Sequence, residues 1–241
     1  MELYYTDKKN ILSNYLLITG SEAHHISKVM RHKPDDIIYV TDGQDNEYQT
    51  IIKKIEKNTI KAEIFNRTRK ARETTAKVTL AQSVVKGNHM DDIIEKATEL
   101  GVFEIQPIIT DRTIASLSDK KAQRYEKLML SAMKSSTRTH LPCLSKLINY
   151  QQLLETTDNY DLALLAYEEE ATSNRLNNFV PQDLVSKVLL IIGPEGGFNN
   201  EEVQQAKKYG VKCFSIGPRR LRSETAAITA LSLLLYELKE M

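Results

Sequence analysis

The N-terminal part of the chain alternates or groups apolar and polar positions in the way that β-strands do. Strands are expected at four segments rich in β-branched and aromatic residues: residues 2–6, 36–43, 47–55 and 59–66. The turn-forming sequence DGQDN separates two of them. A helix is expected over residues 21–33, with Ser21 as its cap and one apolar face made of Ala23, Ile26, Val29 and Met30. The pattern predicts a small β-barrel with one helix over residues 1–72.

From about residue 76 the pattern changes to strands that alternate with helices. Strands are expected over residues 77–85, 102–109, 160–167, 187–192 and 211–216. Helices are expected over residues 88–101, with Gly101 as the C-terminal stop, over 120–136, and from about Glu201 and Glu224. Such alternation predicts an α/β domain over residues 73–241, in which helices cover a parallel sheet. The boundary is expected in the polar segment 66–77, NRTRKARETTAK.

The overall composition adds little to this picture, but the distribution of charged residues along the chain is informative. The chain has 241 residues, 41% of them hydrophobic, and a net charge of +1. Residues 53–72, however, hold 8 basic residues against 2 acidic ones. The basic segment is either a solvated pair of strands or a surface for an anionic partner such as RNA. No signal peptide and no run of about 20 apolar residues is found, so a cytoplasmic protein without a membrane span is expected.

The most unusual stretch is GPEGG at residues 193–197, which follows the apolar run 187–192. Ligands of an open parallel sheet bind at the carboxyl ends of strands, and glycines there let a ligand approach the backbone. The loop lacks the Gly-Lys-Ser/Thr of a phosphate-binding P-loop, and the dinucleotide fingerprint Gly-x-Gly-x-x-Gly is missing. Asn199 and Glu202 are positioned to cap the helix that follows. The two cysteines, Cys143 and Cys213, lie far apart, so no disulfide framework and no metal site is expected.

A second strand ends in Gly-Pro within FSIGPRRLRSETAAITALSLLLYEL, residues 214–238. Ser223 or Thr225 is expected to cap the following helix, and Glu224 lies in its first turn, where a carboxylate suits the helix dipole. The helix is apolar nearly all round, which is typical of a helix buried on more than one side. We therefore expect it to pack against another subunit.

Together, LIIGPEGGF (190–198) and IGPRRLRSETA (216–226) resemble the C-terminal signature of SPOUT methyltransferases. In this combination they resemble the ribosomal RNA small subunit methyltransferase E family. The resemblance extends over the whole chain, through HHISKVMR (24–31), DGQDNEY (42–48), QSVVKGNHMDDIIEKATELGV (82–102) and RTHLP (138–142). Several independent motifs in the order of the family make the resemblance specific.

The resemblance implies a PUA-like RNA-binding β-barrel at residues 1–72 and a SPOUT methyltransferase domain at residues 73–241, with a deep trefoil knot. Knots are so rare that no argument from pattern alone predicts one. It also implies a homodimer that binds S-adenosylmethionine in the knot. The reaction implied is methylation of N3 of a uridine in 16S rRNA, at position 1498 of the standard rRNA numbering, with the small ribosomal subunit as partner.

The resemblance also assigns roles to individual residues. Arg222 is expected to stabilise negative charge on the base or to position phosphate, and Glu195 or Glu224 to act as base or positioning carboxylate. Glu224 is equally consistent with a helix cap. The expected cofactor-binding residues are Leu165, Ala166, Tyr167, Ile192, Gly193, Pro194, Glu195, Gly196, Gly197, Ile216, Gly217, Leu221, Arg222, Thr225 and Ala226. The expected RNA-binding residues are Lys28, Arg31, Lys86, Arg112 and Arg138.

One departure from the family concerns Lys134, which stands where the family carries an acidic residue ahead of Arg138. This charge reversal puts in doubt any role of that acid. Three alternatives stay open at this point. They are a SPOUT methyltransferase for another RNA base or for tRNA, a catalytically inactive RNA-binding assembly factor, and an enzyme that uses the glycine loop for a nucleotide phosphate. The missing loop lysine weighs against the last of them.

Overall fold

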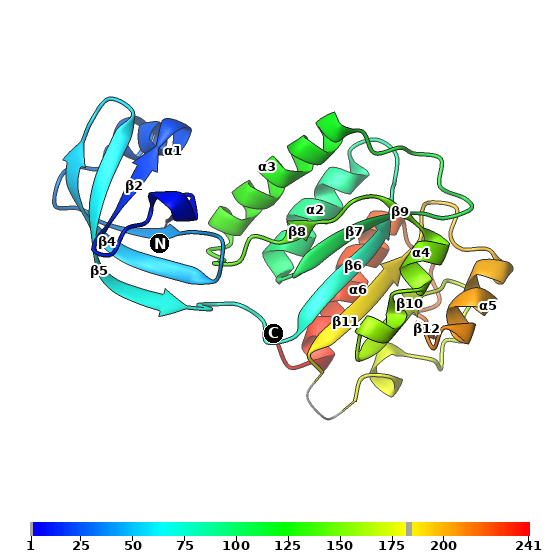
Figure 1. Ribbon diagram of the computed structural model, residues 1–241. Helices are drawn as coiled ribbons and strands as arrows, with labels where there is room; N and C mark the ends of the chain where they lie inside the picture. The colour runs from blue at the N-terminus through cyan, green and yellow to red at the C-terminus, as the bar shows by residue number, and fades with distance from the viewer. Residues whose placement is uncertain (1, 182–184) are drawn as a thin grey trace. The chain divides into compact units, whose positions relative to one another are not determined.

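The computed structural model describes residues 2–181 and 185–241, which form two compact units (Figure 1). The N-terminal unit contains Met1–Glu73 and also Leu130–Leu141, and the C-terminal unit contains Thr74–Met129 and Pro142–Met241. A segment from the middle of the sequence therefore belongs to the N-terminal unit. The pattern of apolar positions gives no sign of this, because it reports neighbours along the chain only.

The N-terminal unit is built on a five-stranded sheet with the order β1-β3-β4-β5-β2. Its strands are β1 (Leu3–Tyr5), β2 (Tyr15–Thr19), β3 (Ile37–Thr41), β4 (Asn46–Ile55) and β5 (Thr59–Arg69). β1 pairs with β3 in parallel and the other pairs are antiparallel. The core consists of alternate strand positions, among them Leu16, Ile18, Val40, Ile52 and Ile60. The four expected strands are confirmed, whereas the sequence analysis did not identify β2.

The helix of this unit differs from the prediction. It consists of α1 (Gly20–His24) and a π-helical turn (His25–Val29), and it ends before residue 33. Ser21 lies inside the first turn and does not cap it; the N-cap is Thr19, without a side-chain hydrogen bond. Ala23 and Ile26 are buried as expected, but Val29 is 58% and Met30 is 39% exposed. Val29 is the last residue of the π turn and Met30 its C-cap, so both lie where the helix ends.

The C-terminal unit contains a seven-stranded sheet in which every strand pair is parallel. Its strands are β6 (Lys77–Ser83), β7 (Glu104–Ile109), β8 (Cys143–Leu144), β9 (Ile148–Asn149), β10 (Leu162–Ala166), β11 (Lys187–Ile192) and β12 (Lys212–Phe214). The order is β12-β10-β11-β6-β7-β8, and β9 also pairs with β7. The expected α/β class is therefore confirmed, and the chain visits the strands out of sequence order.

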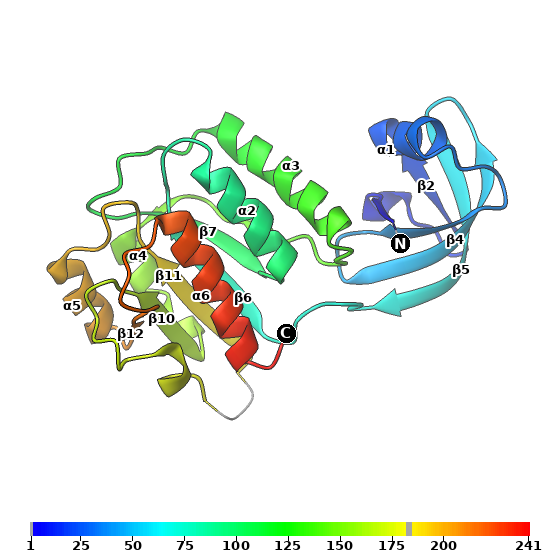
Figure 2. The same cartoon turned by 180° about the vertical axis from the view of Figure 1, so that it is seen from behind.

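Helices cover both faces of this sheet. They are α2 (His89–Leu100), α4 (Tyr150–Leu154), α5 (Asn200–Lys208) and α6 (Ser223–Glu237), while α3 (Asp119–Ser135) begins in this unit and ends in the N-terminal one. Figure 1 shows α4 in front of the sheet, and the reverse view in Figure 2 shows α2 and α6 on the opposite face. Single turns of 3-10 helix occur at Lys8–Asn10, Thr157–Asn159 and Leu176–Asn178. Within the described residues, no helix is both long and apolar enough to cross a membrane.

The ends of the helices test the capping predictions directly. α2 ends at Gly101 in the left-handed conformation (φ 107°), as expected. α5 begins with a capping box, in which Asn199 Oδ1 accepts from Glu202 N at 2.8 Å and Glu202 Oε2 accepts from Asn199 N at 2.9 Å. The expected cap of α6 by Ser223 or Thr225 is wrong, because Arg222 is the N-cap and makes no side-chain cap bond. Ser223 instead uses its hydroxyl elsewhere, as described below.

Candidate functional site

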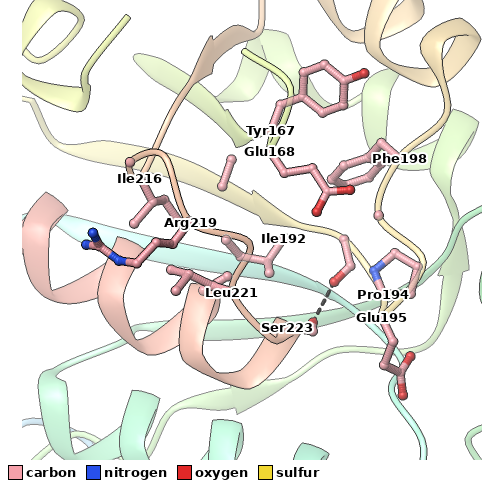
Figure 3. A pocket seen from close by; sticks show the side chains of 15 residues that line it. Tyr167, Glu168, Ile192, Pro194, Glu195, Phe198, Ile216, Arg219, Leu221 and Ser223 are labelled. Carbon is pink, nitrogen blue, oxygen red and sulfur yellow. Dashed lines mark hydrogen bonds between the residues drawn. The ribbon is translucent and has the colours of Figure 1, made fainter. Parts of the chain in front are cut away.

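A pocket opens at the carboxyl ends of β10, β11 and β12, which are neighbours in the sheet (Figure 3). Its empty volume, including the mouth, is about 590 Å³. Three loops and the start of α6 line it: Ala166, Tyr167, Glu168, Ile192, Gly193, Pro194, Glu195, Gly197, Phe198, Ile216, Gly217, Arg219, Leu221, Ser223 and Ala226. The site thus forms where parallel strands release their loops at one edge, as open α/β sheets do.

A side chain at any of the glycines of GPEGG would be tightly packed or strained. A Cβ atom at Gly193 would lie 3.0 Å from the ring of Phe198. At Gly196 it would lie 3.1 Å from Arg112 Cβ. Gly197 has φ +67°, a conformation that side chains rarely adopt, and a Cβ there would meet Glu168 Oε1 at 3.1 Å. The loop is therefore closely packed against its own neighbours, and its backbone forms a wall of the pocket.

Hydrogen bonds from distant parts of the sequence hold this loop in place. Ser223 Oγ donates to the carbonyl oxygen of Gly193 at 2.6 Å and accepts from Gln82 Nε2 at 3.0 Å. Arg112 Nη1 donates to the carbonyl oxygen of Gly196 at 2.8 Å. The backbone N–H of Lys86 donates to Glu195 Oε1 at 2.8 Å. The loop is thus fixed by contacts from β6, from the segments after β6 and β7, and from α6.

Tyr167 closes one side of the pocket, and its hydroxyl group is fixed by polar neighbours. The hydroxyl oxygen lies 2.8 Å from Glu169 Oε2 and 2.9 Å from Asn200 Oδ1. Desolvation, together with the Glu169 carboxylate, raises the pKa of Tyr167 to about 12. The phenol therefore stays protonated at neutral pH, which suits a wall of the pocket and does not suit a general base.

Beside the pocket lies a second hollow, lined by His89, Glu195, Arg220, Leu221, Arg222 and Glu224. It shares Glu195 and Leu221 with the pocket. Glu224 Oε1 lies 3.2 Å from His89 Nδ1 and 4.0 Å from Arg222 Nη1. The Arg222 side chain is 80% exposed, so its guanidinium group is accessible to a ligand. The three residues expected to be catalytic, Arg222, Glu195 and Glu224, therefore surround one hollow.

Most residues expected to bind a cofactor line the pocket, and four do not. Leu165 is fully buried in the core, Gly196 packs against Arg112, Arg222 lines the second hollow, and Thr225 is exposed on α6. Four lining residues were not named from the sequence: Glu168, Phe198, Arg219 and Ser223. All four lie within or beside the motifs already quoted. Including every residue of these motifs and their immediate neighbours would therefore have identified them.

The residues expected to bind RNA fall into two groups. Lys28, Arg31, Lys86 and Arg112 are exposed. The side chain of Arg138, in contrast, is 4% exposed, and its Nη2 donates to Glu73 Oε2 at 2.8 Å. This ion pair accounts for Arg138 without RNA, and we leave it out of the proposal below.

The unusual Lys134 also has a structural partner, because its Nζ donates to Glu22 Oε2 at 2.8 Å. Glu22 Oε1 in turn accepts from the backbone N–H of Tyr5 at 2.9 Å. Within the N-terminal unit, the reversed charge is therefore compensated by a local carboxylate. Lys134 thus joins the segment 130–141 to β1 and α1.

In the part of the chain that the structure describes, no group of three or more His, Cys, Asp and Glu side chains is arranged to hold a metal ion. Cys143 is exposed and Cys213 is buried, and burial raises the pKa of the Cys213 thiol to about 11. Cys213 is therefore an unreactive packing residue, whereas Cys143 is not buried.

Two family models match the chain. One, an RNA methyltransferase domain, matches residues 72–235, and the other, an RNA methyltransferase PUA domain, matches residues 18–65. Among curated proteins, ribosomal RNA small subunit methyltransferase E of Bacillus subtilis is 33% identical over 91% of this chain and 89% of its own length. The protein of the same name from Mesomycoplasma hyopneumoniae is 34% identical over 96% of this chain and 98% of its own length.

Solved structures agree with this similarity. Ribosomal RNA small subunit methyltransferase E from Neisseria gonorrhoeae, bound to S-adenosylmethionine, superposes with a TM-score of 0.88 at 27% identity, covering 98% of this chain and 97% of the other. A Legionella pneumophila protein in complex with S-adenosylmethionine superposes with a TM-score of 0.85 at 28% identity, covering 97% and 96%. The similarity spans both units, and the chain belongs to the ribosomal RNA small subunit methyltransferase E family.

Proposed function

We propose that this chain transfers a methyl group from S-adenosylmethionine to N3 of a uridine in 16S rRNA, at position 1498 of the standard numbering. The observation that carries the proposal is the pairing of a glycine-walled pocket with an adjoining hollow lined by Arg222, Glu195 and Glu224. Membership of the family supplies the reaction class. The nucleotide position rests on the resemblance of the quoted motifs.

The residues of the pocket fit S-adenosylmethionine. Ile192, Ile216, Leu221 and Ala226 offer apolar surface to its adenine and thioether portions, and the glycine loop offers backbone groups without side chains. A Cβ atom at Gly193 would press against the ring of Phe198, so a side chain there would disturb the pocket wall. Solved structures of two relatives contain this cofactor. When bound, it supplies an electrophilic methyl group, so the protein has only to position, desolvate and deprotonate the base.

Arg222 is the residue on which the uridine chemistry chiefly depends in our proposal. Attack by uridine N3 requires that its proton leaves, which puts negative charge on the uracil ring and its oxygens. The exposed, permanently charged guanidinium of Arg222 stabilises that charge, and its forked shape matches a planar imide. The guanidinium stabilises this charge most strongly where the bound RNA excludes water.

Two carboxylates are candidates for the group that accepts the N3 proton or positions the base. Glu224 stands beside His89, and Glu195 accepts a hydrogen bond from the backbone of Lys86. Both line the second hollow together with Arg222. We favour neither, and the proposal requires only that one of them faces the uracil when RNA is bound.

The remaining parts of the proposal concern RNA, assembly and knotting. Lys28, Arg31, Lys86 and Arg112 are exposed cations suited to phosphate contacts. We propose that residues 1–72 act as the RNA-binding barrel and residues 73–241 as a knotted methyltransferase domain that forms homodimers. The reaction would take place in the cytoplasm, on the small ribosomal subunit.

Mass spectrometry of 16S rRNA from a host with the gene deleted tests the assignment. We expect the N3-methyl mark at position 1498 to disappear and to return with a plasmid copy. A mark that persists without the gene would overturn the assignment, and loss of a mark at another base or in tRNA would favour a different RNA substrate. Calorimetry with S-adenosylmethionine separates these outcomes from an inactive assembly factor, which would bind RNA and give no heat with the cofactor.

A further inference from the structure

Two carboxylates line the cofactor pocket, and they are in different situations. Glu195 accepts a hydrogen bond from the backbone of Lys86 at 2.8 Å, and Figure 3 shows its carboxyl group turned away from the centre of the pocket. Glu168 follows β10 and extends its carboxyl group into the space beside Phe198 (Figure 3). One of its oxygens lies 3.1 Å from the point that a Cβ atom of Gly197 would occupy. Glu168 is thus the acid that faces the ligand space.

The second oxygen of Glu168 is engaged by a residue from another loop. Arg220, between β12 and α6, places its Nε 3.2 Å from Glu168 Oε2. The side chain of Arg220 is 69% exposed and that of Glu168 is 34% exposed. An ion pair with this exposure is held weakly, because water screens both partners. The ion pair joins two pocket loops. Replacing one of its partners by another charged group costs little free energy.

We propose that Glu168 exchanges Arg220 for the positive charge of the bound cofactor, and that the released Arg220 becomes an RNA-binding cation of the second hollow. This inference rests on the proposed function, because it takes S-adenosylmethionine as the ligand. S-adenosylmethionine carries a sulfonium and an ammonium group, and Glu168 is the carboxylate that faces them. Arg220 already lines the second hollow with Arg222, so its release adds free positive charge where the RNA substrate binds.

Electrostatics sets the direction of the exchange, in which cofactor binding releases Arg220 from Glu168. Without cofactor, Glu168 neutralises Arg220, and the other guanidinium of the hollow is that of Arg222, which is 80% exposed and lies 4.0 Å from Glu224. With a cation in the pocket, the carboxylate is shared and Arg220 experiences a like charge nearby. Cofactor binding therefore strengthens RNA binding, and by linkage RNA strengthens cofactor binding by the same factor. The chain therefore binds RNA more tightly when S-adenosylmethionine is bound than when the pocket is empty.

Calorimetric titration with S-adenosylmethionine gives a distinctive pair of results. Glu168→Gln removes the counter-charge, and we expect affinity to fall about tenfold. Arg220→Gln removes the competing cation, and we expect affinity to rise about threefold. A bridge that only stiffens the two loops predicts that both variants bind more weakly, and that outcome would overturn the proposal. Thermal melting of each variant verifies that the fold is retained.

A matched control lies two residues along the same loop. Glu170 pairs with Lys207 at 3.1 Å and does not line the pocket. Glu170→Gln therefore removes an equal charge from the same segment, and we expect cofactor affinity to stay within about twofold of the parent chain. If Glu170→Gln weakens binding as much as Glu168→Gln, the effect is general electrostatics and the exchange is excluded.

The coupling to RNA is measured with an rRNA fragment whose target uridine is replaced by cytidine, so that no methyl transfer occurs. In the parent chain, we expect saturating S-adenosylmethionine to tighten binding of this fragment about threefold, and this gain to vanish in Arg220→Gln. An undiminished gain in that variant would contradict the release of Arg220. Absence of cofactor heat in the parent chain would defeat the proposed function itself, whereas normal heat with an unaffected Glu168→Gln variant defeats only the exchange.

Discussion

At the scale of single residues, the glycine loop shows that a cluster of glycines in the sequence does not reveal the structural reason for each of them. Gly193 is required by the aromatic ring of Phe198, and Gly197 by its left-handed backbone and the Glu168 carboxylate. From the sequence, the glycines are expected to allow a ligand to approach the backbone closely. The structure adds that the loop is also packed tightly against the protein's own side chains.

Gly193→Ala tests the steric part of this account. The added methyl group would lie about 3.0 Å from the Phe198 ring, so the ring or the loop must shift and the pocket wall is disturbed. We expect affinity for S-adenosylmethionine to fall about tenfold with a small loss of stability. Calorimetry and thermal melting measure the two effects. Unchanged affinity would contradict the packing argument.

Arg222→Ala tests the role proposed for the exposed guanidinium. Because Arg222 lines the second hollow and not the cofactor pocket, we expect cofactor affinity within about twofold of the parent and a methylation rate at least about 100-fold lower. Transfer of labelled methyl groups to small ribosomal subunits provides the measurement. Arg124→Ala, which removes an arginine paired with Asp91, is the control. A fully active Arg222→Ala chain would remove this residue from the mechanism.

At the scale of elements, the two helices that border the pocket begin in different ways. α5 has a complete capping box, readable from the spacing of Asn199 and Glu202. α6 has the same kind of residues near its start, yet Ser223 bonds to Gly193 and Gln82 and leaves the helix uncapped by a side chain. Local spacing predicts a cap only when no distant group competes for the same hydroxyl.

Asn199→Ala should remove the cap of α5. We expect the free energy of unfolding to fall by about 1 kcal/mol, because the backbone N–H of Glu202 loses its acceptor. Asn199→Ser, which keeps an acceptor oxygen, should recover most of this loss. Urea denaturation of the three chains gives the comparison, and an alanine variant as stable as the parent would show that the cap contributes nothing.

The exposed face of α6 bears on the proposed dimer. Leu233 is 40% and Tyr236 is 68% exposed, although the helix is apolar nearly all round. A double change, Leu233→Glu with Tyr236→Glu, should place charge in a dimer contact and yield monomers in sedimentation experiments. Ile114→Glu, at a residue that is 77% exposed outside α6, should leave assembly unchanged. A double variant that sediments as the parent does would exclude α6 as the contact.

At the scale of the whole molecule, several buried acids prefer their protonated forms. Burial raises the pKa of Cys213 from an ordinary 9.0 to about 11, and the pKa of Tyr167 and of Tyr5 from 10.0 to about 12. Burial also raises the pKa of Tyr4 and of Tyr150 well above the usual value. The folded chain therefore holds protons that the unfolded chain releases in alkali.

The stability should accordingly fall with rising pH. Since the unfolded state binds fewer protons above its own pKa values of about 9 and 10, the free energy of unfolding decreases as pH passes those values and continues to decrease up to about pH 12. Urea midpoints measured between about pH 8 and pH 10.5 should decline, with ionisation of tyrosine followed by absorbance. A midpoint that stays constant or rises over this interval would contradict the argument.

The sequence by itself determined the parallel α/β class, the glycine loop and the α5 cap. Each of these depends on neighbours along the chain, where helical and strand periodicity or a three-residue spacing carries the information. The resemblance of several ordered motifs then supplied the family, which periodicity alone could not supply.

Only the tertiary structure decided which distant groups meet. Because β10 lies between β12 and β11, the loops that hold Glu168, Gly197 and Arg220 converge, and their charges and packing become coupled. The same kind of long-range contact buries Arg138 against Glu73. Another bonds the Ser223 hydroxyl group to Gly193, so that it does not cap α6. Such contacts depend on strand order and not on sequence separation, so no local pattern encodes them.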